Sequence, residues 1–239
     1  NEDHGRHFIT STIEHSSIRA LADDLEQRGW EVTRLSVGEN GVVDAADVEA
    51  AIRPDTVLVS IMTANNEIGT LQPVAEIGRM VKRLRETGRK IWFHTDAVQA
   101  AGKAAVDAEE SGCDLLSISG HKFYAPKGVG LLYVRRGVRL HAQNIGGRQE
   151  RGRRGGTESV PHIVALGKAC ELAAARLADE SDRLGHLRDD LESSVAELIP
   201  NIRFNGDRVR RLPNIANISF PGVEGEALLI NLDMQGVAV

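Results

Sequence analysis

The chain is poor in cysteine and in aromatic residues, and it has no long hydrophobic run. Its two cysteines, Cys113 and Cys170, lie in apolar periodic segments, so we expect free core thiols rather than nucleophiles or a disulfide framework. This cysteine usage favours the cytoplasm as the compartment. No apolar run approaches the roughly 20 residues that cross a bilayer, and the polar N-terminus shows no signal-peptide pattern, so we expect no membrane association.

Charge and aromatic content also argue against a nucleic-acid partner. The formal net charge is −5, and aromatic residues make up 4% of the chain, which gives no electrostatic basis for binding a phosphate backbone. The arginine-rich and glycine-rich stretch at 148–154 resembles an RNA-binding tract, but it contains no aromatic residue on which a base could stack. We therefore expect no nucleic-acid binding.

Segments typical of strands and helices alternate through the first 135 residues. Short apolar runs predict strands at 7–11, 31–35, 56–61, 90–93, 114–118 and 130–134. Amphipathic segments predict helices at 17–28, 45–52 and 73–88. Alternation at this spacing predicts an α/β fold in which helices cover a mainly parallel sheet.

The pattern changes after Arg135. A loop rich in glycine and arginine spans 146–156. Further helices and short strands are predicted at 160–177, 184–198, 201–204, 215–220 and 224–234. We predict a large domain at 1–177, which we expect to lack an N-terminal part, and a small, incomplete α+β domain at 178–239.

Two short segments carry the candidate chemistry. The sequence HTDAVQ at 94–99 and the sequence SGHK at 119–122 each follow a predicted buried strand. Strand ends of this kind line the ligand crevice of a parallel α/β sheet, so Asp96 and Lys122 should meet there. A lysine can form a Schiff base with pyridoxal phosphate, and a carboxylate can keep the pyridine nitrogen protonated.

Neighbouring side chains could complete such a site. Ser119 and His121 can donate hydrogen bonds to an anion, and Gln99 could reach the phenolic oxygen of the ring. His15 and Asn66 each follow a strand-like run by a few residues, so both could reach the same crevice.

Ordinary structural roles compete with these assignments. A lone lysine after a strand is usually a solvated charge, and Asp96 could cap a helix that begins at Ala97. The Asn65-Asn66-Glu67 cluster could be turn chemistry. His94, Asp96 and His121 could ligate a metal, but their spacing matches no specific metal signature.

At these residues the chain resembles the cysteine desulfurase family, within the class V aminotransferase group of pyridoxal phosphate enzymes. Selenocysteine lyases are close relatives of that family. The resemblance covers nearly the whole chain and rests on motifs that occur in the family's order. These motifs are Thr12–His15, Ala64–Gly69, His94–Gln99, Ser119–Gly128 and Gln149–Thr157.

The resemblance implies a role for each candidate that would face the cofactor ring. Lys122 would form the Schiff base and move protons, and His15 would stack on the ring and assist the acid–base steps. Asp96 would pair with the ring nitrogen. Asn66 and Gln99 would contact the phenolic oxygen.

The resemblance also implies a phosphate site and a dimer. Ser119 and His121 would hold the phosphate, and Thr157 would reach the phosphate site of a neighbouring subunit in a homodimer. Two family features have no counterpart in the sequence, namely the phosphate-gripping loop that we expect before Asn1 and the loop with the nucleophilic cysteine that we expect after Val239. An arginine that binds the substrate carboxylate would follow that second loop.

The implied activity is that of a pyridoxal phosphate-dependent cysteine desulfurase. Such an enzyme takes sulfur from L-cysteine as a persulfide, forms L-alanine, and can pass the sulfur to an acceptor protein. The alternatives are a selenocysteine lyase and a truncated, inactive domain that binds a partner. Neither Cys113 nor Cys170 lies where the family places its nucleophile.

Overall fold

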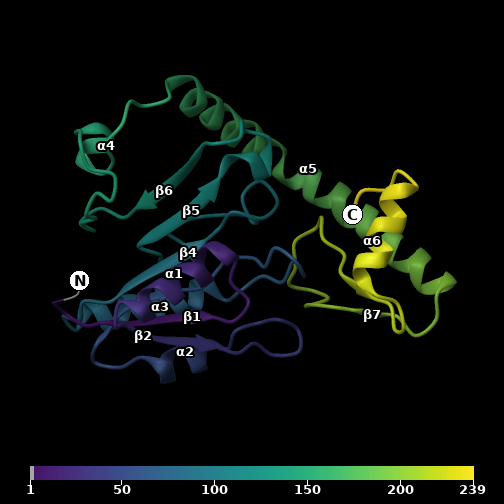
Figure 1. The fold of residues 1–239 in the computed structure, drawn as a ribbon, viewed down its shortest axis with the longest axis horizontal. Helices are drawn as coiled ribbons and strands as arrows, with labels where there is room; N and C mark the ends of the chain where they lie inside the picture. The colour runs from purple at the N-terminus through teal and green to yellow at the C-terminus, as the bar shows by residue number, and fades with distance from the viewer. Residues whose placement is uncertain (1–2) are drawn as a thin grey trace.

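A computed structural model, which describes residues 3–239, has a six-stranded sheet at its centre (Figure 1). The strands are β1 (His7–Ser11), β2 (Glu31–Leu35), β3 (Thr56–Ser60), β4 (Trp92–Asp96), β5 (Leu115–Ser119) and β6 (Gly130–Val134). Their order is β2-β1-β3-β4-β5-β6; the first five are mutually parallel, and β6 runs antiparallel to β5. The predicted α/β class with a mainly parallel sheet is confirmed.

Helices follow the strands as the alternation predicts, with ends shifted by a few residues. The first part contains α1 (Ser16–Gln27), α2 (Ala45–Ala51), α3 (Val74–Glu86) and the 3₁₀ turn η1 (Gly120–Phe123). The second part contains α4 (Gln149–Gly152), α5 (Val160–Leu198), β7 (Arg203–Phe204), β8 (Ile218–Ser219) and α6 (Gly225–Met234). No helix within residues 3–239 combines the length and the apolar character needed to cross a membrane.

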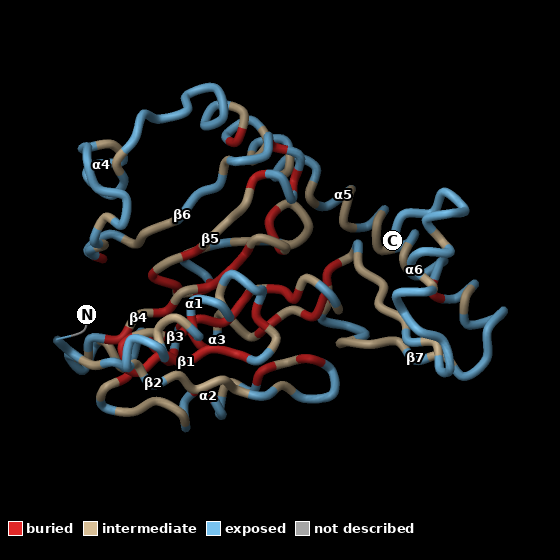
Figure 2. The backbone as a smooth tube through the Cα atoms, in the orientation of Figure 1, coloured by how far each residue is buried: buried red, intermediate tan, exposed pale blue. Residues whose placement is uncertain are grey.

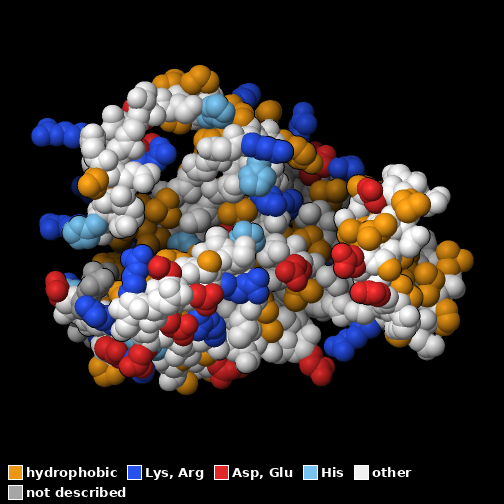
Figure 3. Space-filling model, in the orientation of Figure 1, with side chains coloured by type: hydrophobic (Ala, Val, Ile, Leu, Met, Phe, Trp, Pro, Cys, Tyr) orange, Lys and Arg blue, Asp and Glu red, His pale blue; other side chains and the backbone are white. Residues whose placement is uncertain are grey.

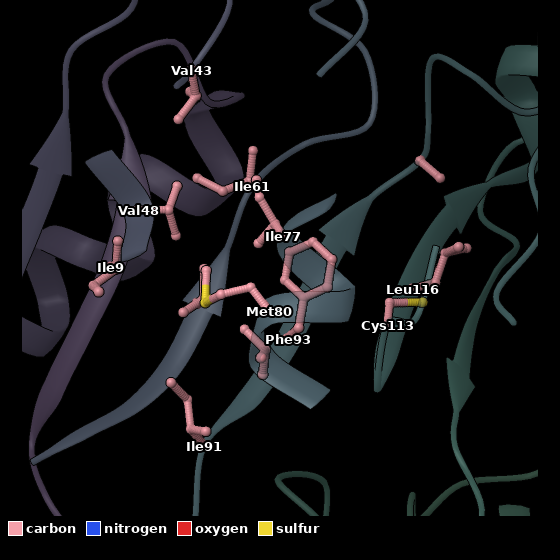
Figure 4. Close-up of a cluster of buried hydrophobic side chains, with 13 residues drawn as sticks. Ile9, Val43, Val48, Ile61, Ile77, Met80, Ile91, Phe93, Cys113 and Leu116 are labelled. Carbon is pink, nitrogen blue, oxygen red and sulfur yellow. The ribbon is translucent and has the colours of Figure 1, made fainter. Parts of the chain in front are cut away.

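The main core lies between the central strands and α3 (Figure 4). Val59 of β3 and Phe93 of β4 are fully buried, and so are Ile77 and Val81 on the apolar face of α3. Burying a side chain of this size stabilises the fold by about 1.5–3 kcal/mol. The buried residues concentrate in the sheet strands, whereas most of α5 and α6 is exposed (Figure 2).

One long helix replaces the two that we predicted at 160–177 and 184–198. The intervening residues 178–183 are mostly polar but contain neither glycine nor proline, so they do not interrupt the helix, and α5 runs for 39 residues. The boundary predicted between positions 177 and 178 therefore falls inside a helix. In the second half of α5, Leu187 and Leu191 are more than half exposed.

The C-terminal part returns to the large sheet domain through residues 205–217, a segment that we call the strap. The Leu71 amide donates to the Arg210 carbonyl at 2.9 Å, and the Leu212 amide donates to the Gly69 carbonyl at 2.8 Å. Leu212 itself is fully buried. The strap therefore holds the loop after β3 in place. The following helix α6 is less well covered, and its hydrophobic side chains are exposed on the right of Figure 3.

A buried ion pair joins the strap to α5. Glu192 is 3% exposed, and Arg211, whose side chain is 5% exposed, donates to both of its carboxylate oxygens at 2.6 and 2.8 Å. Burial alone would raise the pKa of Glu192, but Arg211 and Arg208 outweigh it and hold that pKa below its usual value. The carboxylate depends on these partners because an unpaired buried charge is strongly unfavourable.

We predict that Arg211→Ala lowers the free energy of unfolding by about 3 kcal/mol, because it leaves the buried Glu192 carboxylate with only the half-exposed Arg208. Urea unfolding followed by circular dichroism measures the change. Arg183→Ala is the matched control, since the Arg183–Glu180 pair on α5 is exposed and should matter little. Equal, small effects of the two substitutions would contradict the prediction.

Candidate active site

A cavity of about 300 Å³ opens at the carboxyl ends of β1, β3, β4 and β5. Its lining consists of His15, Ser17, Met62, Ala64, Asn66, Asp96, Val98, Gln99, Ser119, His121 and Lys122. The chain leaves β1 towards β2 on one side, whereas β3 leads to β4 on the other. The cavity therefore lies where the strand order changes direction, which is the usual ligand position in such sheets.

The cavity brings together seven of the eight predicted site residues, all except Thr157. Thr157 is exposed in the segment between α4 and α5. That segment and α4 arch away from the sheet, linking β6 to the start of α5 (Figure 1). Thr157 is therefore outside the cavity of its own chain, and its predicted role in a neighbouring subunit stays a prediction.

His15 enters the cavity from the turn between β1 and α1. It is the N-cap of α1, and its Nδ1 atom accepts a hydrogen bond from the Ser17 amide at 3.2 Å. This bond fixes the ring at a helix N-terminus, where unpaired amide groups need acceptors. The capping role and a place in the cavity are thus compatible.

The loop after β3 contains a tight turn, and Asn65 makes it. The Asn65 side-chain oxygen accepts from the amides of Glu67 and Ile68, both at 2.9 Å, and its amide group donates to the Ile13 carbonyl at 2.9 Å. Within the Asn65-Asn66-Glu67 cluster, the side chain that stabilises the turn is therefore that of Asn65. Asn66 lines the cavity instead.

Asp96 is the last residue of β4 and is 8% exposed. Its Oδ1 atom accepts from the Val98 amide at 2.9 Å, as the capping alternative requires, although residues 98–103 form turns rather than a helix. Burial raises the pKa of Asp96, and the neighbouring His15 partly opposes that rise. A buried carboxylate in this state is stabilised by a cation placed beside it.

Lys122 is presented by η1, directly after β5. Ser119 ends the strand, and its hydroxyl lies 2.9 Å from Nδ1 of His121. A side chain at Gly120 would meet Ala125 and Leu166 at 2.9 Å, so this position needs glycine for the turn to pack closely. The exposed Lys122 side chain lines the cavity rather than the core.

Two charged residues near the cavity were not predicted as site residues. Lys103 lies beside Lys122, and burial together with that neighbouring charge lowers the pKa of Lys103. Its Nζ atom is 3.4 Å from the side-chain oxygen of Gln99, four residues earlier. The sequence signal that could have identified Lys103 is its position four residues after Gln99, a spacing at which the two side chains can meet.

Glu14 is the second missed residue, and it is 2% exposed. Its Oε1 atom accepts from the Ser11 hydroxyl at 2.7 Å and from the Met62 amide at 3.0 Å. Burial, with a smaller contribution from the nearby Asp96, raises the pKa of Glu14 to about 7, although the hydrogen bonds from Met62 and Ser11 oppose the rise. The sequence shows Glu14 beside His15 but not its contact with Met62, which lies 48 positions away.

The alternative metal site at His94, Asp96 and His121 gains no support. Both ring nitrogens of His94 are engaged, at 2.7 Å from the Ser60 hydroxyl and 2.9 Å from the Ser117 hydroxyl. Burial lowers the pKa of His94 to about 4, so the ring is neutral. In the described part of the chain, no cluster of three ligating side chains could hold a metal ion.

The cysteines lie away from the cavity. Cys113 is fully buried in the main core, and burial raises the pKa of its thiol. Cys170 is partly buried on α5 and packs against a second hydrophobic cluster. Both are free thiols, as expected, and neither lines the cavity.

The chemistry of the lining fits pyridoxal phosphate. Lys122 offers an amine for the aldehyde, and Asp96 offers a buried carboxylate for a cationic ring nitrogen. Ser119 and His121 offer polar groups for a phosphate, and Asn66 and Gln99 offer amide donors for an oxyanion. The remaining wall includes the apolar side chains of Met62, Ala64 and Val98.

We predict that Glu14→Gln becomes more stable relative to the wild type as the pH rises from 5 to 8. The folded-state pKa of Glu14, about 7, exceeds its reference value of 4.5. The neutral acid therefore stabilises the fold below pH 4.5, and this stabilisation is lost as the pH rises through 7. Glutamine cannot ionise, so the difference in unfolding free energy should reach up to about 3 kcal/mol.

Urea unfolding at several pH values measures this difference. Glu49→Gln is the control, because Glu49 is an exposed residue of α2. A difference between wild type and Glu14→Gln that does not change with pH would mean that Glu14 is already ionised at pH 5.

Comparison with known proteins places the fold and the site in context. The family model described as aminotransferase class-V matches residues 2–239. The cysteine desulfurase IscS of Clostridium botulinum is 48% identical over 239 residues, covering 99% of this chain and 59% of that protein. The chain thus spans about three fifths of the length of this relative.

Solved structures agree with this comparison. A structure described as a NifS-like protein superposes with a TM-score of 0.94 at 38% identity, covering 100% of this chain and 64% of the other. SspA in complex with cysteine superposes with a TM-score of 0.78 at 35% identity, covering 97% of this chain and 62% of the other.

Proposed function

Because the chain belongs to the aminotransferase class-V family, we propose that the whole protein is a pyridoxal phosphate-dependent cysteine desulfurase. The observation that carries the proposal is the cavity, which combines Lys122 with the buried Asp96 at adjacent strand ends. The relative at 48% identity is a cysteine desulfurase, which supports the same activity.

When bound, pyridoxal phosphate would supply an electron-withdrawing ring that stabilises negative charge on the substrate carbon. Lys122 would hold the cofactor through its amine and then move the proton at the substrate Cα atom. Asp96 would keep a proton on the ring nitrogen, because a buried carboxylate favours an adjacent cation. His15 would lie against the ring and assist proton transfer.

The other polar residues of the cavity would orient the cofactor. Asn66 and Gln99 would donate to the phenolic oxygen, and Lys103 would hold the Gln99 side chain in place. Ser119 and His121, already 2.9 Å apart, would bind the phosphate.

The proposed substrate is L-cysteine, and the cysteine complex of the structural neighbour SspA supports this choice. A thiolate would attack the substrate sulfur, so that the carbon–sulfur bond breaks, a sulfur–sulfur bond forms, and alanine leaves after protonation. Neither Cys113 nor Cys170 lines the cavity. The attacking thiolate would therefore come from another part of the whole protein, and the persulfide sulfur could pass to an acceptor protein.

We also propose that the protein works as a homodimer in which Thr157 reaches the partner's phosphate site. Large apolar side chains are exposed on both sides of the segment that carries Thr157: Ile145, before α4, is 85% exposed, and Val164, in α5, is 65% exposed. A second copy would bury this surface. Two unpaired cysteines support the cytoplasm as the compartment.

We predict that Lys122→Ala abolishes both turnover of L-cysteine and the visible absorption band of the bound cofactor. Borohydride reduction and peptide mapping of the wild type should place the reduced pyridoxyl group on Lys122. Lys127→Ala is the matched control, because Lys127 is an exposed lysine outside the cavity lining. Turnover like that of the wild type in Lys122→Ala would reject the proposed function.

We predict that Asp96→Asn retains the cofactor on Lys122 but lowers kcat by about a hundredfold, because a neutral amide cannot stabilise the protonated ring nitrogen. Absorption spectra and alanine production measure the two effects. Asp47→Asn, an exposed residue of α2, is the control. An unchanged kcat in Asp96→Asn would remove Asp96 from the proposed mechanism.

The proposed substrate separates this function from the two alternatives. We expect sulfide and alanine to form from L-cysteine, measured with a reductant present. Selenide formed from selenocysteine, with no sulfide from cysteine, would identify a selenocysteine lyase. A folded protein that neither binds the cofactor nor turns over either amino acid would be the inactive binding domain.

A further inference from the structure

We propose that Glu14 is a positioning residue that ties the end of β1 to the end of β3 and thereby fixes His15 at the wall of the cavity. The role of His15 that this serves rests on the proposed function, whereas the tie between the strands stands on geometry alone. Glu14 precedes His15 directly, so a constraint on one residue limits where the other can lie.

Backbone pairing between β1 and β3 stops before the cavity. Their parallel register ends at the pair Thr10 and Ser60. Beyond it, β1 stays with β2, and the Thr12 amide donates to the Leu35 carbonyl at 2.9 Å. The chain after β3 stays with β4 instead, and the Ile61 amide donates to the His94 carbonyl at 3.2 Å. The two chains therefore separate at the place where the cavity opens.

The Glu14 side chain spans this separation. One carboxyl oxygen accepts from Ser11, the last residue of β1, at 2.7 Å, and from the Met62 amide, two residues beyond β3, at 3.0 Å. A single side chain thus replaces the backbone bonds that the diverging strands no longer make. Met62 and His15 both line the cavity, so the bond sets the distance between two of its walls.

A second hydrogen bond supports the same turn. The Asn65 side chain donates to the Ile13 carbonyl at 2.9 Å. The turn of His15 is therefore held on both sides, by Glu14 and by Asn65. Removing Glu14 should loosen His15 without unfolding the sheet.

The charge state of Glu14 suits this role. Its other carboxyl oxygen, Oε2, is buried and has no hydrogen-bond partner among the described residues. Burial raises the pKa of Glu14 to about 7, and Asp96 on β4 is the charged group that acts on it. His15, at the start of α1, acts in turn on Asp96. A neutral Glu14 adds no second negative charge beside the carboxylate proposed to pair with the cofactor.

Glutamine can keep the two accepted hydrogen bonds of Glu14, whereas alanine cannot. The test therefore compares Glu14→Gln and Glu14→Ala with the wild type, in the full-length protein and at pH 6. Glu49→Ala, which alters an exposed glutamate of α2, is the control.

The first measurement needs no cofactor. Nitrogen-15 spectra of the apoprotein report the tautomer and the environment of the His15 ring. We expect His15 signals like those of the wild type in Glu14→Gln and in Glu49→Ala, and shifted or broadened signals in Glu14→Ala. Unchanged His15 signals in folded Glu14→Ala would overturn the inference.

The second measurement uses the loaded enzyme. We expect Glu14→Ala to lower kcat by about tenfold, because a displaced catalytic group slows the reaction, while KM for cysteine changes by less than about twofold. Glu14→Gln should restore kcat. A kcat in Glu14→Gln as low as in Glu14→Ala would show that negative charge matters rather than the hydrogen-bonded tie, and would overturn the inference.

Failure of the proposed function and failure of the Glu14 tie can be distinguished. A wild-type protein that binds no cofactor on Lys122 rejects the proposed function, whereas the His15 signals still decide the tie. If Glu14→Ala does not fold, Ser11→Ala removes one of the two donors and should shift the His15 signals in the same way by a smaller amount. Unchanged His15 signals in folded Ser11→Ala would then overturn the inference.

Discussion

The divergence of β1 from β3 is the constraint on which the site depends. Parallel strands bring their carboxyl ends to one edge, and the change in strand order prevents the chains after Thr10 and Ser60 from continuing to pair. A cavity forms there because backbone hydrogen bonds no longer draw the two chains together. Its polar lining follows from the same cause, since residues just past a strand end project from loops that need no apolar face. Asp96 is buried because it is the last residue of β4, whereas Lys122 is exposed because it lies three residues beyond the end of β5.

Three titratable side chains near this edge are buried or partly buried, and each differs from the others in its hydrogen-bond partners and in the shift of its pKa. His94 is kept neutral between two serine hydroxyls and contributes only to the packing of the sheet. Glu14 accepts two hydrogen bonds, and its pKa is raised to about 7. Asp96 accepts one hydrogen bond, from the Val98 amide. Burial raises its pKa, and the nearby His15 partly opposes that rise. Of the three, only Asp96 faces the cavity, so only its buried carboxylate is available to a ligand cation.

Sequence patterns predicted the strands, most helices and seven of the eight residues that were expected at one site, because these depend on local periodicity and on residues next to strand ends. The patterns failed where a distant partner changes the meaning of a residue. Polar His94 and Thr95 suggested that the strand had ended, yet both lie within β4, with hydroxyl groups of neighbouring segments as partners. In the sequence, Glu14 is only the residue before His15. Its role becomes visible in the hydrogen bond that it accepts from the amide of Met62, which is distant in sequence.

The strap extends the same reasoning to the C-terminal part of the chain. It pairs with the loop between Asn65 and Leu71 through backbone hydrogen bonds, and the Asn217 side chain donates to the Glu67 carbonyl at 3.1 Å. That loop carries Asn66 into the cavity. The loop lies beyond the pairing of β3 and β4, so its position depends in part on a segment more than 130 residues later, in addition to the bond from Asn65 to Ile13. The long helix α5 carries Glu192, whose pairing with Arg211 holds the strap in place, and the outer helix thereby contributes to the geometry of a site that it does not touch.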